Sequence, residues 1–374
     1  MKIASIDVLR VAIPFDDGGV PAGASAAASA KPKAMETLLV KLTADSGEVG
    51  WGEAFGHRIN ASTFAALAEC VGPLFIGAEV DPGASRVAST RLEEAHKAFH
   101  LFGRTGPALY AISALDIALW DLKAQALKTP LHRLLGGRRQ RVTCYASLVT
   151  YNANVEAVVR NALRAHAAGF RHIKLHEKDF DAIRAVREAL PSDVALMVDV
   201  NCVWPPAEAR VQATRLASLG LTWLEEPVWP PDDVESLAAL RDIGLPLAAG
   251  ENASGLDGYE RCLKAGAVDV IQPSVTKLGG ITAMFQAFEL GRRHGARVQP
   301  HCFYYGAGLM ATAHAVAGLD EHAMLEVPWV EFEQHLSPAS RFAAQFTLDD
   351  TPGLGFVPDA GVLEKYLIER ARVG

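Results

Sequence analysis

The chain has 374 residues, of which 50% are hydrophobic and 21% are charged. That balance is typical of a folded globular protein and excludes a disordered or membrane-embedded chain. The formal net charge of -7 argues against nucleic acid as a partner, because phosphate binding needs a basic surface.

The N-terminal stretch MKIASIDVLRVAIPF is interrupted by Asp7 and Arg10 before a signal-like apolar run develops. It is therefore expected to form a first strand and not an export signal. The five cysteines are odd in number and contain no CxxC pair, which predicts reduced core thiols in a cytoplasmic protein.

Residues 1–130 mix two further strand-like runs, METLLVKLTAD and GEVGWGEA, with helical segments, and predict an α+β unit. The run DDGGVPAGASAAASAKPKA is either a flexible surface loop or a lid that becomes ordered over a bound substrate. The apolar stretch ALYAISALDIALWDLKAQAL contains Asp116, Asp121 and Lys123, so it is expected to be a packed helix and not a membrane span.

From about residue 140 onward, short strand-like runs alternate with helical segments. Eight such runs are centred near residues 143, 173, 197, 224, 249, 271, 299 and 325. This alternation is typical of a parallel (β/α) barrel, although an open doubly wound sheet would also show it. In a barrel, the polar residues that follow each strand converge on one face.

Three of these strand ends carry a carboxylate: Asp199, Glu225 and Glu251, spaced 26 residues apart. A lone carboxylate at such a place would cap a helix or pair with a lysine. Three that converge would repel one another without a cation, and oxygen ligands of this kind suit Mg²⁺. The spacing therefore predicts a magnesium site.

Basic side chains follow other strands: Lys174 and His176 share one strand face, and Lys277 follows a later strand. A divalent cation that binds a substrate carboxylate can stabilise the enediolate formed when the adjacent carbon loses a proton. A lysine near that cation has its ammonium form disfavoured and becomes a usable base. The alternative is that these lysines are solvated ion-pair partners.

The motifs SALDIALWDLKAQALKTPLHRLLGG, VDVN, WLEEPV, GEN, KLGGI, PHC and LEVP, in this order, resemble the enolase superfamily in its mandelate racemase and muconate lactonizing enzyme branch. The resemblance implies an α/β fold: a modified (β/α)7β TIM-type barrel over residues 131–351. An α+β capping domain would be formed by residues 1–130 and completed by residues 352–374. It also implies a small-molecule carboxylate as substrate and a homo-oligomer.

Carried over to this sequence, the resemblance makes Asp199, Glu225 and Glu251 the Mg²⁺ ligands. Lys174 and His176 fall on the second-strand Lys-x-Lys motif, and Lys277 on the sixth-strand lysine. His301 would match a seventh-strand histidine that works with an aspartate, and Glu326 an eighth-strand glutamate that hydrogen-bonds the substrate carboxylate.

Two residues depart from the family pattern. His176 replaces the second lysine of the motif, and a histidine can still act as a base at neutral pH. Ser274 replaces the aspartate, so His301 is expected to lack the carboxylate that would orient it and raise its basicity. This favours Lys277 over His301 as the base on the second substrate face.

Other side chains near the strand ends are candidates for binding substrate: Asn201, Trp329 and Tyr304, and, in the N-terminal part, His57 and Arg58. The aromatic residues favour a partly apolar substrate, unless the rings pack between helices.

We expect Mg²⁺-dependent removal of the α-proton of a carboxylate, in a racemase or epimerase. The alternative is a dehydratase that removes water from a β-hydroxy carboxylate, either a sugar acid or a hydroxy-amino acid. A remote alternative is a noncatalytic barrel that only binds ligands.

Overall fold

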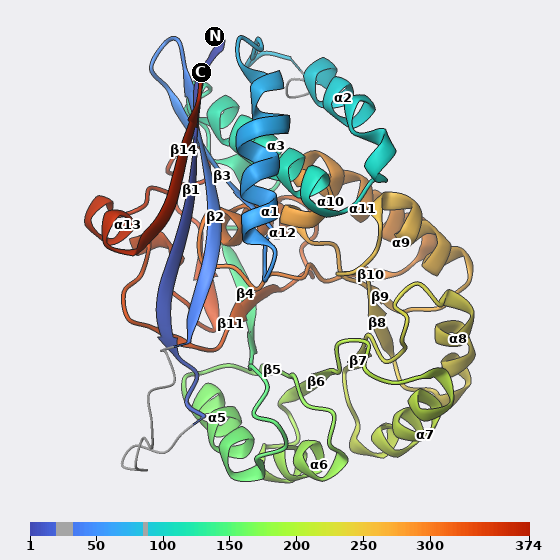
Figure 1. The fold of residues 1–374 in the computed structure, drawn as a ribbon. Coiled ribbons are helices and arrows are strands. Elements are labelled where there is room, and N and C mark those ends of the chain that lie inside the picture. Colours follow the sequence, from blue (N-terminus) through green and yellow to red (C-terminus); the bar gives the residue numbers. More distant parts are fainter. Residues whose placement is uncertain (20–32, 85–88) are drawn as a thin grey trace.

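A computed structural model describes residues 1–19, 33–84 and 89–374. Two sheets organise the described chain, one built from both ends of the sequence and one curled into a ring (Figure 1). The two ends of the described chain lie close together at the edge of the first sheet (Figure 1).

The first sheet has the order β12-β1-β2-β3, with β14 paired to β1. Its pairings are antiparallel, and Ile6 of β1 lies opposite Val373 of β14. The strands are β1 (Ile3–Asp16), β2 (Ala34–Ala44), β3 (Val49–Ala54), β12 (Glu331–Phe332) and β14 (Leu367–Val373).

Helix α3 (Gly106–Ala126) packs against strand β3. The two glycines of the GWG motif permit this close approach. A Cβ atom on Gly52 would lie 2.0 Å from the carbonyl oxygen of Ala114, and one on Gly50 would lie 2.2 Å from that of Ala118. The helix is buried along most of its length, and it is the packed helix that the sequence predicts.

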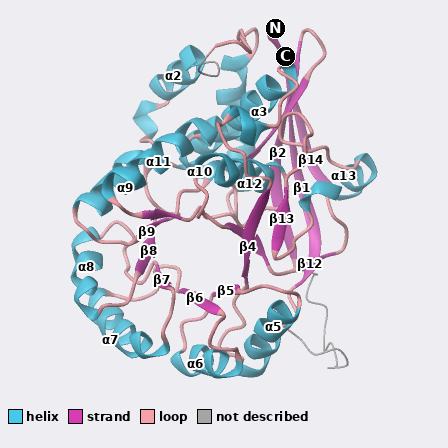
Figure 2. Cartoon of the chain, turned by 180° about the vertical axis from the view of Figure 1, so that it is seen from behind, coloured by secondary structure: helices cyan, strands magenta, loops and turns pink. Residues whose placement is uncertain are grey.

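The second sheet confirms the barrel expectation. Eight parallel strands of the described chain follow the order β10-β9-β8-β7-β6-β5-β4-β11 and curl into a ring (Figures 1 and 2). Strand β13 (Gln345–Thr347) pairs antiparallel with β4. The ring strands are β4 (Arg141–Ser147), β5 (His172–Leu175), β6 (Ala195–Asp199), β7 (Trp223–Glu225), β8 (Leu247–Ala249), β9 (Val270–Ile271), β10 (Arg297–Val298) and β11 (Leu325–Pro328).

Helices surround the ring (Figure 2). Several begin at an Asx residue whose side chain accepts a backbone N–H, as Asn154, Asp179 and Asp233 do at the starts of α5, α6 and α8. The helices of the ring are α5 (Val155–Ala167), α6 (Phe180–Ala189), α7 (Pro206–Leu216), α8 (Val234–Ala239), α9 (Gly255–Lys264), α10 (Val275–Leu278), α11 (Gly280–His294) and α12 (Ala307–Leu319). The others are α1 (Asn60–Ala65), α2 (Ser89–Ala98), α4 (Leu131–Leu134) and α13 (Ala360–Tyr366).

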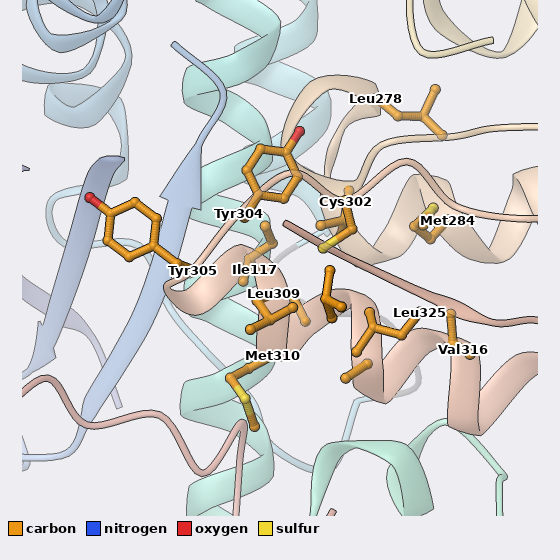
Figure 3. Packing of buried hydrophobic residues seen from close by; sticks show 14 of the residues in the cluster. Ile117, Leu278, Met284, Cys302, Tyr304, Tyr305, Leu309, Met310, Val316 and Leu325 are labelled. Atoms are coloured by element: carbon orange, nitrogen blue, oxygen red, sulfur yellow. The ribbon is translucent and has the colours of Figure 1, made fainter. Parts of the chain in front are cut away.

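The main core runs from the first sheet into the ring. In Figure 3, Leu309, Met310 and Val316 of α12 lie near Ile117 of α3 and Leu325 of β11. The two sheets thus share one apolar core through α3 and α12. A second, smaller cluster comes from five of the ring strands, β4 and β6 to β9: Tyr145, Met197, Trp223, Ala248 and Val270.

Not every expectation about the chain is met. Cys144, Cys202 and Cys302 are buried and free, but Cys70 is exposed and Cys262 is half-buried, so the prediction that all five are core thiols is wrong. Most of the candidate lid, residues 20–32, lies outside the described residues. Within the described chain, no helix is long and apolar enough to span a membrane. The domain boundaries near residues 130 and 352 stay predictions.

Candidate active site

Three carboxylates lie together at the ends of neighbouring ring strands. Asp199 ends β6, Glu225 ends β7, and Glu251 follows β8 by two residues. One oxygen from each lies within 4.8 Å of the others. Asp199 and Glu225 are fully enclosed, and the Glu251 side chain is 16% exposed. This buried set of oxygen donors fits a hard divalent cation.

Lys174 of β5 is the cation closest to this group. Its ammonium nitrogen lies 2.9 Å from Glu225 Oε1, 2.8 Å from Glu326 Oε1 and 3.5 Å from Asp199 Oδ2. The side chain is fully buried. Burial alone would lower the pKa of Lys174, but the three carboxylates outweigh it and hold the pKa well above its usual range. The surroundings therefore favour Lys174 as an ammonium group.

Local hydrogen bonds fix the carboxylates. The backbone N–H of Asn201 donates to Asp199 Oδ1 at 2.8 Å, and Trp223 Nε1 donates to Glu225 Oε2 at 3.0 Å. Burial and neighbouring Asp199 raise the pKa of Glu225, while Lys174 opposes them. Lys174 also lowers the pKa of Asp199, although burial opposes this shift.

His176 faces the metal-ligand candidates. Its Nδ1 lies within hydrogen-bond distance of the Leu148 carbonyl oxygen, and its Nε2 lies 3.2 Å from Asp199 Oδ2. A carbonyl can only accept, so Nδ1 carries the proton in this contact. A carboxylate also only accepts, so the contact of Nε2 with Asp199 is a hydrogen bond only when Nε2 carries a proton.

Lys277 lies in the short helix α10, not at a strand end as the sequence suggests. Its Nζ lies 3.2 Å from Asn252 Oδ1 and 3.7 Å from Glu251 Oε1. Asn252 in turn donates through Nδ2 to Glu226 Oε2 at 2.7 Å. Lys277 therefore contacts Glu251, whereas Lys174 contacts Asp199 and Glu225.

His301 and Ser274 behave partly as expected. Ser274 Oγ hydrogen-bonds the Tyr304 hydroxyl at 2.5 Å, and among the described residues His301 Nδ1 has no hydrogen-bond partner. The expectation that no carboxylate orients His301 is wrong, because its Nε2 lies 3.0 Å from Glu251 Oε2. Burial lowers the pKa of His301, but Glu251 outweighs it and the pKa is raised.

Three further candidates for contact with substrate are Glu326, His57 and Tyr304. Glu326 lies within β11, and its Oε2 accepts the Cys302 N–H at 2.7 Å. Burial and Arg58 lower the pKa of His57, whereas Glu251 raises it. The pKa of His57 therefore depends partly on the carboxylate group. Tyr304 packs edge-on against His301, with ring centroids 5.8 Å apart.

The last three candidates for contact with substrate are Trp329, Asn201 and Arg58. The Trp329 ring packs edge-on against Phe170 with centroids 5.5 Å apart, which matches the alternative that a ring packs within the fold. Asn201 and Arg58 are exposed and have positive φ. Their roles as substrate contacts stay predictions.

The sequence reasoning missed two neighbours of Lys277. Asn252 directly follows Glu251 in the GEN motif, so its place in the motif could have indicated it. Phe55 comes from the end of β3, and its ring lies 4.5 Å from Lys277 Nζ. No local pattern joins residues 55 and 277.

Comparison with known proteins agrees with this geometry. Residues 24–136 match the mandelate racemase / muconate lactonizing enzyme N-terminal domain, and residues 157–362 match the enolase C-terminal domain-like family. The chain belongs to the enolase superfamily, in the mandelate racemase and muconate lactonizing enzyme branch. Its fold is the capping domain and barrel of that superfamily.

Similar proteins in this superfamily are named as enzymes. The D-galactarolactone cycloisomerase of Agrobacterium fabrum is 32% identical over 336 residues, which is 86% of each chain. The arabinonate dehydratase of Saccharolobus solfataricus is 27% identical over 350 residues, covering 89% of this chain and 91% of its own.

A solved structure, the L-talarate dehydratase of a Polaromonas species complexed with Mg and L-glucarate, has a TM-score of 0.82 and 25% identity, covering 100% of this chain and 99% of its own. An isomerase or hydro-lyase activity for this chain is therefore supported.

Proposed function

We propose that this protein removes the α-proton of a hydroxylated carboxylate such as a sugar acid, with Mg²⁺ as cofactor, and then expels the β-oxygen as water. The observation that carries the proposal is the buried set of Asp199, Glu225 and Glu251, flanked by Lys174 and His176 on one side and by Lys277 on the other.

Asp199, Glu225 and Glu251 would hold the ion, because each offers an oxygen to the same small volume. When bound, Mg²⁺ would supply positive charge that stabilises the enediolate of the substrate. Lys174 and Glu326, which form an ion pair at 2.8 Å, would lie beside the substrate carboxylate, with the ammonium group donating to it.

His176 and Lys277 are the proposed proton carriers. Nε2 of His176 would be the atom that carries the proton, because Nδ1 is engaged by the Leu148 carbonyl and Nε2 faces the carboxylate group. Lys277 is held near Glu251 and Asn252, where its amine can give or take a proton on the other substrate face. His301, whose Nε2 lies 3.0 Å from Glu251 Oε2, is close enough to the carboxylate group to be a further acid candidate.

Two of the three relatives named above are dehydratases and one is a cycloisomerase, and the two dehydratases favour elimination over racemisation. A dehydratase of a sugar acid removes the α-proton and a β-hydroxyl group, and arabinonate and talarate are sugar acids. The racemase or epimerase expectation remains the second candidate, because His176, just after β5, and Lys277, in α10, contact different carboxylates and could serve opposite substrate faces.

The experiment is to incubate the protein and Mg²⁺ with a panel of aldonic and aldaric acids in D₂O, and to follow mass and optical rotation. Loss of water is the expected result. Gain of deuterium without loss of water would favour the racemase or epimerase instead. Neither change with any acid, while Mg²⁺ still binds, would contradict the proposal.

A further inference from the structure

The end of strand β3 docks on two segments of the ring. Glu53 Oε2 accepts the backbone N–H of Gly308, at the start of α12, at 2.7 Å. Two residues later, the backbone N–H of Phe55 donates to the carbonyl oxygen of Thr276, in α10, at 3.3 Å. The backbone around Phe55 is thus tied to the turn that carries Lys277.

The ring of Phe55 lies beside the Lys277 amine. Lys277 Nζ is 4.5 Å from the ring centroid, and the Lys277 side chain is 10% exposed. Tyr110 of α3 packs against Phe55 in a T-shaped arrangement, with centroids 5.1 Å apart and planes at 76°. This contact restricts rotation of the Phe55 ring beside the amine.

The amine is therefore held between two parts of the molecule. On one side is the aromatic face of Phe55, contributed by the first sheet. On the other is Asn252 Oδ1, at 3.2 Å, contributed by the barrel. An aromatic face attracts an ammonium group through its quadrupole, most strongly where water is excluded.

We propose that Phe55 is a positioning residue for Lys277: its ring face fixes the lysine nitrogen in the place from which it exchanges a proton with substrate. This inference rests on the proposed function, in which Lys277 is a proton carrier. Proton transfer depends on reach and alignment over tenths of an ångström, so a lysine with a free side chain would spend less time in the productive place.

The first test needs no substrate. The protein is treated with a trace of acetic anhydride at one fixed pH, and acetylation of Lys277 is measured by peptide mass spectrometry relative to the exposed Lys264. Phe55→Leu removes the ring face, and we expect Lys277 acetylation to rise about threefold or more because the amine is no longer held. Phe55→Trp keeps an aromatic face and should leave acetylation near the wild-type level.

Phe180→Leu is the matched control. It makes the same chemical change at another aromatic residue that contacts a cation, since Arg215 Cζ lies 4.3 Å from the Phe180 ring. Unchanged acetylation of Lys277 in Phe55→Leu would overturn the proposal, as would equal increases in Phe55→Leu and Phe180→Leu. If Phe55→Leu does not fold, Phe55→Met removes the ring while keeping an apolar side chain and carries the same comparison.

A second test uses a substrate found by the D₂O experiment. Phe55→Leu should lower kcat about fivefold or more while KM and the Mg²⁺ half-saturation stay near wild type, and Phe55→Trp should retain kcat. A change confined to KM would contradict a positioning role. If wild type turns over no acid in the panel, the proposed function fails, while the acetylation result still decides whether Phe55 holds Lys277.

Discussion

Lys174 balances the charge of the buried carboxylates. Its nitrogen contacts Glu225, Glu326 and Asp199 within 3.5 Å, and the side chain has no exposed surface. Removing one partner of a buried ion pair leaves uncompensated charge in a poorly solvated place. The lysine is therefore expected to contribute to the stability of the fold.

Lys174→Met should lower the free energy of unfolding by about 3–5 kcal/mol in the absence of metal, because three carboxylates lose their cation. Mg²⁺ should restore more of the stability in this variant than in wild type, since the ion then supplies the missing charge. The measurement is the urea unfolding midpoint with Mg²⁺ and with a chelator. Equal Mg²⁺ effects in both proteins would contradict this account.

Lys277→Met should lower kcat by about 10²–10⁴-fold, which is the range for loss of an acid or base. The Mg²⁺-induced rise in melting temperature should persist, because the carboxylate oxygens remain. Lys365→Met, at a lysine that contacts the Tyr366 ring on the surface, is the control and should keep wild-type turnover. A wild-type kcat in Lys277→Met would show that Lys277 is not an acid or base in the reaction.

At the scale of elements, the contact between β3 and α3 tolerates no side chain at Gly52. A Cβ there would lie 2.0 Å from a backbone oxygen of α3, so the helix or the strand has to move. We expect Gly52→Ala to lower the free energy of unfolding by about 3 kcal/mol or more through overpacking. Thermal unfolding measures this, with Gly47→Ala as the control, since a Cβ at Gly47 would meet nothing within 4 Å.

Because Gly47 has a φ of 98°, its alanine variant tests backbone strain without overpacking. A loss of stability in Gly52→Ala no greater than that in Gly47→Ala would mean that the helix moves away at little cost.

The ring strands were predictable from the sequence because each is a short apolar run that ends in a polar residue. Each of the eight predicted runs overlaps an observed strand, from β4 near residue 143 to β11 near residue 325. The shared placement of Asp199, Glu225 and Glu251 followed from the same regularity, since the carboxyl ends of parallel strands meet on one face.

Contacts between the two sheets were not predictable in this way. The approach of Phe55 to Lys277 depends on how the first sheet docks. Within the barrel, the pairing of His301 with Glu251 depends on side-chain rotamers and was not predictable either. The packing of Trp329 against Phe170 likewise depends on the outer layer of the barrel and not on any period in the sequence.

At the scale of the whole molecule, the buried side chain of Glu53 links the first sheet to the barrel. Burial raises its pKa to about 7, although hydrogen bonds from Thr37 and Gly308 oppose the shift. The folded state then holds more protons than the unfolded state between the unfolded pKa and about pH 7. The stability from this group is therefore greatest at low pH and is lost as pH rises through 7.

Glu53→Gln cannot ionise, so its free energy of unfolding should fall less than that of wild type between pH 5 and pH 8. The difference should be at most about 3 kcal/mol. Urea unfolding at both pH values measures it. Glu79→Gln is the control, because the Glu79 side chain is 81% exposed. A pH response of Glu53→Gln equal to that of wild type would contradict the assignment.

The pairing of β1 with β14 has a consequence for how the chain folds. Ile6 and Val373 are neighbours in the sheet, although the whole barrel lies between them in the sequence. During synthesis, β1 is made long before β14. One edge of β1 therefore has no strand partner while the barrel forms. An open edge of this kind is a template for pairing between chains, and crowded nascent chains should aggregate through it unless a chaperone covers it.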